Sequence, residues 1–345
     1  MTLSNVFIGK KVVQQIYLNN AIIYQSKGWK TLPSTAQEVW TKKYDNFTNN
    51  SICTIDLNNC IYYADGISLV KFDSDGMLLW KKPYIGAYKV CIGGDNTPYL
   101  ASKKQRSDSS KLGVIINKLD ENGDSIQEAC ISSNTTVDSI TNFIIDNNYL
   151  YVSTTSQDYS YLFKVDKDLK PLAKANVNPV NLVTTNEEQY LYYSNGIQIL
   201  RIDKDNFQNV GTVIQAVTSI VSINMDKLGN IVYYSGSDLY KYNIASKSIT
   251  TVKGTTNNLC KQFCIDYQQN IYSINGDAST NYKINLVKVS SDNTVIYNIN
   301  IGEELANNIL SGKLIVDNNG NIYYLYINIS NQLVIKKLIN LVKKG

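Results

Sequence analysis

The residues that most often perform chemistry are sparse in this 345-residue chain, and histidine is absent. Without histidine there is no Ser-His-Asp or Cys-His arrangement, no HExxH zinc site and no imidazole base. The six cysteines contain no CxxC pair, which argues against a structural zinc site, and no GxGxxG or Walker-type phosphate loop occurs. We therefore expect no catalytic residue, no metal ligand and no cofactor, and we predict that the chain is not an enzyme.

Carboxylates are the remaining candidates for catalysis, since a pair of them can cleave a glycosidic bond. Asp73-Ser74-Asp75-Gly76 together with Trp80 approaches the repeated "Asp box" of sialidases, but the spacing differs and no second good copy exists. The two arginines, Arg106 and Arg201, cannot supply the arginine triad of those enzymes. Segment 120–124 (DENGD) has a calcium-like composition, but its glycine stands at position four rather than six of an EF-type loop. Tight turns are predicted for both segments.

A tyrosine that recurs seven times indicates the architecture that must position any such side chain. The gaps between successive copies are 37, 52, 41, 41, 39 and 51 residues. Periods near 40 with several short strands per unit predict a β-propeller with one blade per repeat. Doublets such as Tyr62-Tyr63 invite a carbohydrate-stacking role, but neighbouring strand residues face opposite sides, so we interpret both members as core. The seven copies are Tyr62, Tyr99, Tyr151, Tyr192, Tyr233, Tyr272 and Tyr323.

A column of basic residues follows on the next strand of each repeat, and we interpret it as structural, with the aliphatic stems lying on apolar surface. Its members are Lys71, Lys118, Lys164, Arg201, Lys241, Lys288 and Lys337. The last repeat lacks room for its outer strand, because the nine-residue offset from Lys71 to Trp80 would end at 346. Segment 38–44 (EVWTKKY) echoes 78–84 (LLWKKPY), so a strand around Trp40 is predicted to complete the seventh blade and close the ring.

The chain is thus predicted to be all-β, with a seven-bladed β-propeller of four-stranded blades over residues 37–345. Residues 1–28 hold short strand-like runs separated by turns, which predict a small β-hairpin module that anchors the chain on a partner. Residues 29–36 are interpreted as a linker. Polar insertions at 102–111 and 275–281 account for the two long repeats and are candidates for binding loops; no single residue is singled out for ligand binding.

Composition excludes several other roles. The net charge is only +4, the lysines are dispersed and arginine is nearly absent, so no nucleic-acid partner is expected. The first twenty residues lack the features of a signal peptide, and no apolar run approaches the length of a membrane span, so we expect synthesis in a bacterial cytoplasm and no membrane insertion. The scattered cysteines are expected to be free thiols.

Two segments resemble known families. Residues 69–80 (LVKFDSDGMLLW) resemble the repeat of bacterial seven-bladed propellers of the PQQ-like and SBBP type. That resemblance extends over about residues 37–345, and it implies a fold without implying a function or a cofactor site. Residues 5–24 (NVFIGKKVVQQIYLNNAIIY) are similar to N-terminal segments of tail and baseplate proteins from phages of low-GC Gram-positive bacteria. Those segments carry a doubled I-Y-L-G…I-Y pattern, and Asn19 stands here where glycine is common.

The second resemblance implies a non-enzymatic component of a phage tail or phage tail-like particle, located in the virion. In this prediction residues 1–28 contact other tail or baseplate proteins, and several copies are present per particle. The propeller then adheres to a host cell-wall glycan or teichoic acid, with multivalent presentation strengthening weak single contacts. Two alternatives stay open: a structural baseplate hub that makes only protein–protein contacts, and an enzyme that cleaves glycans by hydrolysis or elimination through Asp, Glu and Tyr.

Overall fold

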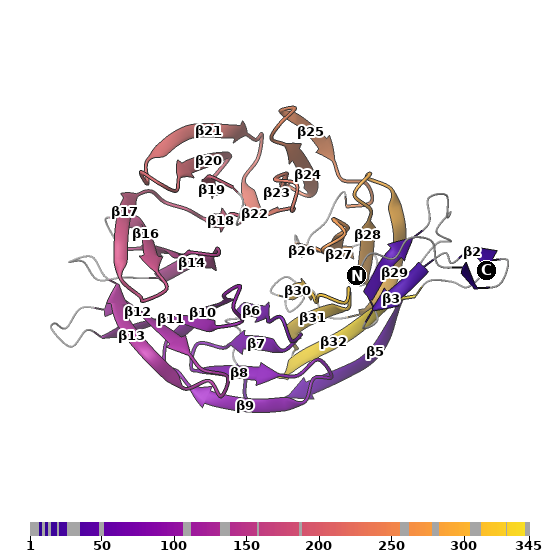
Figure 1. The fold of residues 1–345 in the computed structure, drawn as a ribbon, viewed down its shortest axis with the longest axis horizontal. Coiled ribbons are helices and arrows are strands. Elements are labelled where there is room, and N and C mark those ends of the chain that lie inside the picture. The colour runs from indigo at the N-terminus through magenta and orange to yellow at the C-terminus, as the bar shows by residue number, and fades with distance from the viewer. Residues whose placement is uncertain are drawn as a thin grey trace.

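The computed structural model describes residues 35–47, 52–105, 112–131, 139–156, 159–185, 188–255, 262–277, 283–303, 312–328 and 330–341, together with the backbone of four short strands nearer the N-terminus. These described parts contain β-strands and no helix, and consequently no helix that could cross a membrane. Seven sheets of four antiparallel strands are arranged around a central axis (Figure 1). The prediction of an all-β, seven-bladed propeller is confirmed.

Six blades follow one another along the chain, and in each the strands run in sequence order from the inside of the ring to the outside (Figure 1). Blade 1 comprises β6 (Ile52–Ile55), β7 (Ile61–Ala64), β8 (Ser68–Phe72) and β9 (Leu78–Pro83). Blade 2 comprises β10 (Ala87–Ile92), β11 (Pro98–Gln105), β12 (Leu112–Leu119) and β13 (Ser125–Ile131). Blade 3 comprises β14 (Ser139–Ile145), β15 (Tyr149–Thr155), β16 (Ser160–Asp166) and β17 (Pro171–Asn176).

Blade 4 comprises β18 (Asn181–Val183), β19 (Tyr190–Asn195), β20 (Gln198–Asp203) and β21 (Asn209–Gln215). Blade 5 comprises β22 (Ile220–Met225), β23 (Ile231–Ser235), β24 (Asp238–Asn243) and β25 (Ser248–Thr251). Blade 6 comprises β26 (Gln262–Ile265), β27 (Ile271–Asp277), β28 (Lys283–Val289) and β29 (Val295–Glu303).

Blade 7 is built from both ends of the chain. Its inner strands are β30 (Lys313–Val316), β31 (Ile322–Ile327) and β32 (Leu333–Leu341), and its outer strand is β5 (Thr35–Tyr44). Lys337 pairs with Trp40 across the β32–β5 ladder, so the predicted closure of the ring is confirmed. Pairing with β5 covers the edge of β32 that would otherwise be unpaired.

Two short hairpins precede the ring. β1 (Phe7–Ile8) pairs with β2 (Lys11–Val12), and β3 (Gln15–Leu18) pairs with β4 (Ala21–Gln25), both antiparallel. The anchoring role of residues 1–28 stays a prediction.

A carboxylate at the end of the inner strand organises the first turn of several blades. Its Oδ1 accepts a hydrogen bond from the backbone N–H two residues further on, as Asp317 does from Asn319 at 2.9 Å. This hydrogen bond gives a partner to a turn N–H that no neighbouring strand can pair with. The neighbouring column tyrosine donates its hydroxyl to Oδ2 in three blades: Tyr151 to Asp146 at 3.1 Å, Tyr272 to Asp266 at 3.0 Å and Tyr323 to Asp317 at 3.1 Å. The ammonium of Lys71 lies 4.9 Å from the ring centre of Tyr62. These contacts agree with the structural interpretation of both columns.

Tryptophans on the outer strands of blades 7 and 1 pack against a turn of the next blade. A Cβ at Gly76 of blade 1 would lie 2.6 Å from Trp40, and one at Gly123 of blade 2 would lie 2.7 Å from Trp80. Both glycines end tight turns in the left-handed conformation, with φ of +72° and +79°. The Asp-box-like segment 73–76 and the calcium-like segment 120–124 are therefore turns, as predicted. The glycine of each turn leaves room for the tryptophan indole of the preceding blade to pack against it.

Candidate functional site

Blade 5 departs from the tyrosine column, and the sequence-based assignment of Tyr233 to that column is wrong. Lys241 pairs with Val232, whereas Lys71 of blade 1 pairs with Tyr62. Because successive strand residues face opposite sides, the one-residue shift turns Tyr233 toward blade 4 and leaves Val232 facing blade 6. The other six registered positions hold tyrosine: Tyr62, Tyr99, Tyr151, Tyr192, Tyr272 and Tyr323.

The outer strand of blade 5 is also reduced in size. Thr250 lies opposite Lys241, at the position that Trp80 takes in blade 1 and Trp40 takes in blade 7. A valine and a threonine thus occupy the two places where blades 1 and 7 present a tyrosine and a tryptophan. Close packing of the blade 5–blade 6 boundary would require that lost volume to be filled from elsewhere.

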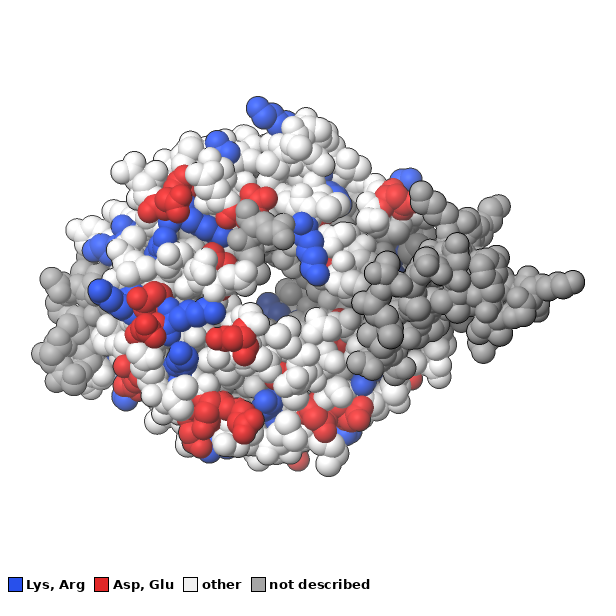
Figure 2. All heavy atoms as spheres, in the orientation of Figure 1, with Lys and Arg blue, Asp and Glu red and all other residues white. Residues whose placement is uncertain are grey.

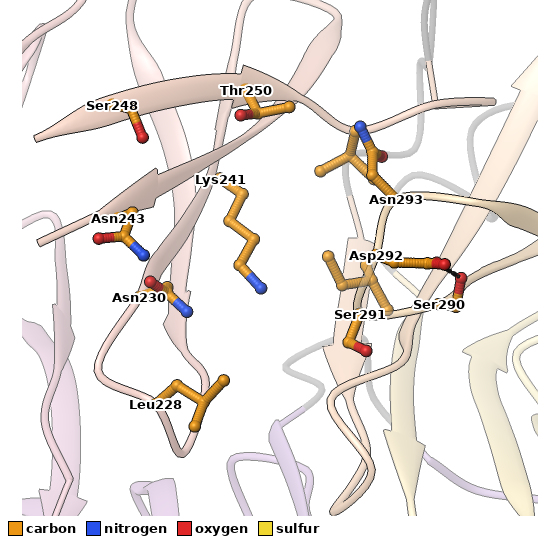
Figure 3. Close-up of a pocket in the computed structure, with 12 residues that line it drawn as sticks. Leu228, Asn230, Lys241, Asn243, Ser248, Thr250, Ser290, Ser291, Asp292 and Asn293 are labelled. Atoms are coloured by element: carbon orange, nitrogen blue, oxygen red, sulfur yellow. Dashed lines mark hydrogen bonds between the residues drawn. The ribbon is translucent and has the colours of Figure 1, made fainter. Parts of the chain in front are cut away.

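Open space lies beside Thr250. A cavity of about 400 Å³ lies between the two blades. In Figure 3, Lys241 extends into it from β24, with Asn230 and Asn243 on one side and the turn bearing Ser291 and Asp292 on the other. The lining residues are Leu228, Asn230, Lys241, Asn243, Ser248, Thr250 and Val252 of blade 5, and Ile271, Ser290, Ser291, Asp292 and Asn293 of blade 6.

A buried carboxylate holds Lys241 in place. Its Nζ lies 2.9 Å from Oδ2 of Asp226, whose side chain is 2% exposed. Asp226 also accepts the backbone N–H groups of Leu228 and Asn230, and the amide of Asn230. The Lys241 side chain is 22% exposed, twice the 11% of Lys71. The site therefore presents an oriented ammonium group that faces open space with N–H groups to spare.

The facing turn of blade 6 is rigid and polar. Asn293 donates to the carbonyl of Thr251 at 2.9 Å and accepts the N–H of Lys253 at 2.9 Å, which ties the turn to blade 5. Asp292 accepts the hydroxyl of Ser290 and the N–H of Thr294. The Ser290 hydrogen bond is the main cause that lowers the pKa of Asp292, so this carboxylate is ionised at neutral pH. Lys241 and Asp292 therefore lie on opposite walls of one cavity, and the Asp292 carboxylate is directed toward Ser290 (Figure 3).

Other candidate residues lie apart from this cavity. Of the predicted insertions, residues 102–105 end β11 and residues 275–277 end β27, while 106–111 and 278–281 fall outside the described residues. Among the side chains that the structure describes, no group of three or more acidic, cysteine or histidine residues could hold a metal ion. The sequence signal that could have located the cavity is Val232, at the one of the seven registered positions that does not hold tyrosine, together with the small Thr250 opposite Lys241.

Comparison with solved structures gives strong matches of fold. A virginiamycin B lyase from Staphylococcus aureus superposes with a TM-score of 0.64 at 12% identity, covering 88% of this chain and 99% of the lyase. A streptogramin B lyase gives 0.63 at 11% identity, with 88% and 98% covered. A chain of a mitotic checkpoint complex gives 0.65 at 9% identity, with 94% and 98% covered. No family model and no curated protein matches the sequence. At such identities the similarity shows the fold alone.

These neighbours correct the predicted function. The prediction of a non-enzymatic phage tail component is wrong, because two of these three structures are lyases and none is a tail or baseplate protein. The prediction that the chain is not an enzyme is wrong for the same reason: its ring is one that enzymes use. Absence of histidine removes imidazole chemistry, but it leaves the lysine and carboxylate chemistry of the cavity. The seven-bladed part of the resemblance is confirmed, and the predicted partners and virion localisation stay predictions.

Proposed function

We propose that the propeller binds a small polar molecule with an anionic group in the cavity between blades 5 and 6. One observation carries this proposal. At the boundary where blades 1 and 7 place a tyrosine and a tryptophan, blade 5 places Val232 and Thr250, and the space so released exposes Lys241. The ammonium group is already oriented by Asp226, so little conformational entropy is lost when a ligand engages it.

The walls define the chemistry of the ligand. Its anionic group would lie at Lys241, and the amides of Asn230 and Asn243 line the cavity on the same side. Hydroxyl or amino groups would face Asp292, which accepts hydrogen bonds. A volume of about 400 Å³ is at the small end of the range for ligand sites. A compact hydroxylated carboxylic acid fits this combination of size and polarity.

The test is binding of gluconate and glucuronate, two compact hydroxylated acids, measured by ligand-detected NMR and calorimetry. Lys241→Met keeps the aliphatic stem and removes the charge, and we expect it to weaken binding roughly tenfold or more. Lys71→Met is the matched control, because Lys71 is the member of the basic column in blade 1. It pairs with Asp56 and does not line this cavity. A second variant, Thr250→Trp with Asn293→Gly, would recreate the tryptophan–glycine contact of blades 7 and 1 and fill the cavity.

Wild-type binding that is lost in Lys241→Met and in the filled variant, and retained in Lys71→Met, supports the proposal. Binding that is equal in all four proteins, or no binding of either acid at millimolar concentration, contradicts it.

A lyase reaction at the same cavity is a second candidate, favoured by the lyases that share the fold and by the presence of both Lys241 and Asp292 among the residues that line the cavity. In an elimination, Asp292 would take the proton next to a substrate carbonyl. The C–H electron pair would form the carbon–carbon double bond, and the leaving group would depart with its own bonding pair. Lys241 would stabilise the negative charge that develops on the carbonyl oxygen.

Incubation with a streptogramin B antibiotic, followed by chromatography and mass spectrometry, tests the lyase reaction. Elimination adds no water to the products, whereas hydrolysis adds one. Asp292→Asn should abolish turnover and retain binding of the antibiotic. Turnover that survives in both Asp292→Asn and Lys241→Met would refute the assignment of these two residues.

A further inference from the structure

Seven residues of the inner strands lie at one level of the central channel. Each pairs with a residue of the second strand of its blade, two positions after the residue that pairs with the basic column. For example, Lys89 pairs with Ala101, and Lys313 pairs with Leu325. We call this set the channel layer. Its members are Ile52, Lys89, Asn142, Asn181, Ser222, Gln262 and Lys313.

The channel layer is polar and open to water. All seven members are partly exposed, although the strands that carry them are the innermost of the ring. Figure 2 looks along the axis into an opening at the centre of the ring, and Lys or Arg atoms are seen within it. Six of the seven members are polar, two of them are lysines, and none is acidic. Such a composition favours an anion in the channel.

Neither lysine of the layer has a counter-charge among the residues that the structure describes. Among the described residues Lys89 and Lys313 form no ion pair and no side-chain hydrogen bond, whereas column lysines such as Lys241 are paired with aspartate. The strands packed against β10 are β6, β7, β11 and β14, and they carry no carboxylate. Their titratable groups are Cys53, Tyr62, Tyr63, Tyr99, Lys103 and Lys104.

The surroundings of Lys313 are similar. Strands β6, β26 and β31, which contact β30, carry no carboxylate, and β27 has only Asp277, its last residue. Burial, and then the like charge of Lys313, lower the pKa of Lys89 to about 8. Both lysines lie at one level of the channel, and the described strands packed against them carry no carboxylate other than Asp277.

We propose that the channel layer is an anion site that takes a phosphate group, with Lys89 and Lys313 as its two cations. An oxyanion between them replaces one repulsion by two attractions. The amide and hydroxyl side chains of the same level can contact its remaining oxygens. This site belongs to blades 2 and 7, and it is separate from the cavity between blades 5 and 6.

The experiment is calorimetric titration of the whole chain with inorganic phosphate at pH 8.5, with sodium chloride of equal ionic strength as the reference. We expect saturable binding that Lys89→Met and Lys313→Met each weaken roughly tenfold or more. Lys253→Met, at an exposed loop lysine, is the control and should leave phosphate binding unchanged. Lys241→Met should also leave it unchanged, so the outcome is independent of the cavity proposal.

A second readout separates binding from a structural effect. A bound anion favours the charged form of Lys89, so phosphate binding at pH 8.5 should take up protons, and the measured enthalpy should depend on the ionisation enthalpy of the buffer. Lys89→Met and Lys89→Gln should abolish this proton uptake. Phosphate binding that persists in both Lys89→Met and Lys313→Met, binding without proton uptake, or no signal above the chloride reference would each overturn the proposal.

Discussion

The contact that closes the ring can be tested with a single methyl group. In Gly76→Ala the new Cβ would lie 2.6 and 2.9 Å from two ring carbons of Trp40 and 3.1 Å from Lys42. Gly76 belongs to a turn of blade 1, and Trp40 belongs to the strand that completes blade 7. The substitution therefore acts at the boundary between blades 7 and 1, against the strand that the N-terminal part of the chain contributes to blade 7.

The expected loss of stability has two parts. An L-residue at φ +72° costs about 1–2 kcal/mol in backbone conformation. The overlap with Trp40 adds about 1–3 kcal/mol, because overpacking a filled interface forces side chains out of their preferred positions. The turn cannot move away freely, since Lys337 donates to the carbonyl of Ser74 at 2.7 Å and Tyr44 donates to the carbonyl of Gly76. The total is about 2–5 kcal/mol.

Gly196→Ala provides the matched control, because Gly196 has a similar φ of +62° and nothing within 4 Å of its Cβ position. It should lose only the conformational part, about 1–2 kcal/mol. Equilibrium urea unfolding followed by tryptophan fluorescence measures both variants, and adding Trp40→Leu to each should abolish the difference between them. If Gly76→Ala is no less stable than Gly196→Ala, then Trp40 does not pack on this turn, and the described packing of blade 7 on blade 1 is wrong.

Three further predictions concern charge and thiol chemistry. Lys204→Met should cost about 3–5 kcal/mol, because it strands the buried Asp146 that lies 2.9 Å away, whereas Lys82→Met, at an exposed pair, should cost less than about 1 kcal/mol in the same urea assay. The pKa of Lys89 is lowered from 10.5 to about 8 in the folded protein, so the unfolded chain binds this proton more tightly. The free energy of unfolding should therefore rise, by at most about 3 kcal/mol, as the pH rises from 8 to 10.5. This rise should be missing in Lys89→Met. A thiol reagent at pH 8 should modify the exposed Cys130 first, because burial raises the pKa of Cys53 to about 12; mass spectrometry of the peptides would show the order.

The ring itself could be predicted from the sequence because its signals are local and repeated. An apolar run, a turn with aspartate or asparagine, and a strand with tyrosine recur in every unit. The closure by Trp40 also followed from the sequence, since the last repeat lacks an outer strand. These features depend on strand periodicity and turn chemistry, which neighbouring residues determine.

The cavity could not be predicted in the same way. The run Ile231-Val232-Tyr233-Tyr234 is compatible with either of two registers, and only pairing with β24 decides that Val232 faces blade 6. A register shift of one residue exchanges the two faces of a strand without changing its composition. Function was missed for a different reason: neither the absence of histidine nor the similarity of the N-terminal segment concerns the surfaces that the ring creates.

A small residue in the outer strand creates a site only where the next blade fails to fill the space. Blade 3 shows the compensated case: Ala173 lies opposite Lys164, but Phe207 of blade 4 packs there, stacked 6.5 Å from Tyr151. Blade 5 has no such compensation, since the next turn contributes Asn293, whose side chain is tied to β25. A well-packed propeller tolerates variation when volume lost in one blade is gained in its neighbour. The boundary between blades 5 and 6 breaks that balance, and for this reason we assign the ligand site to it.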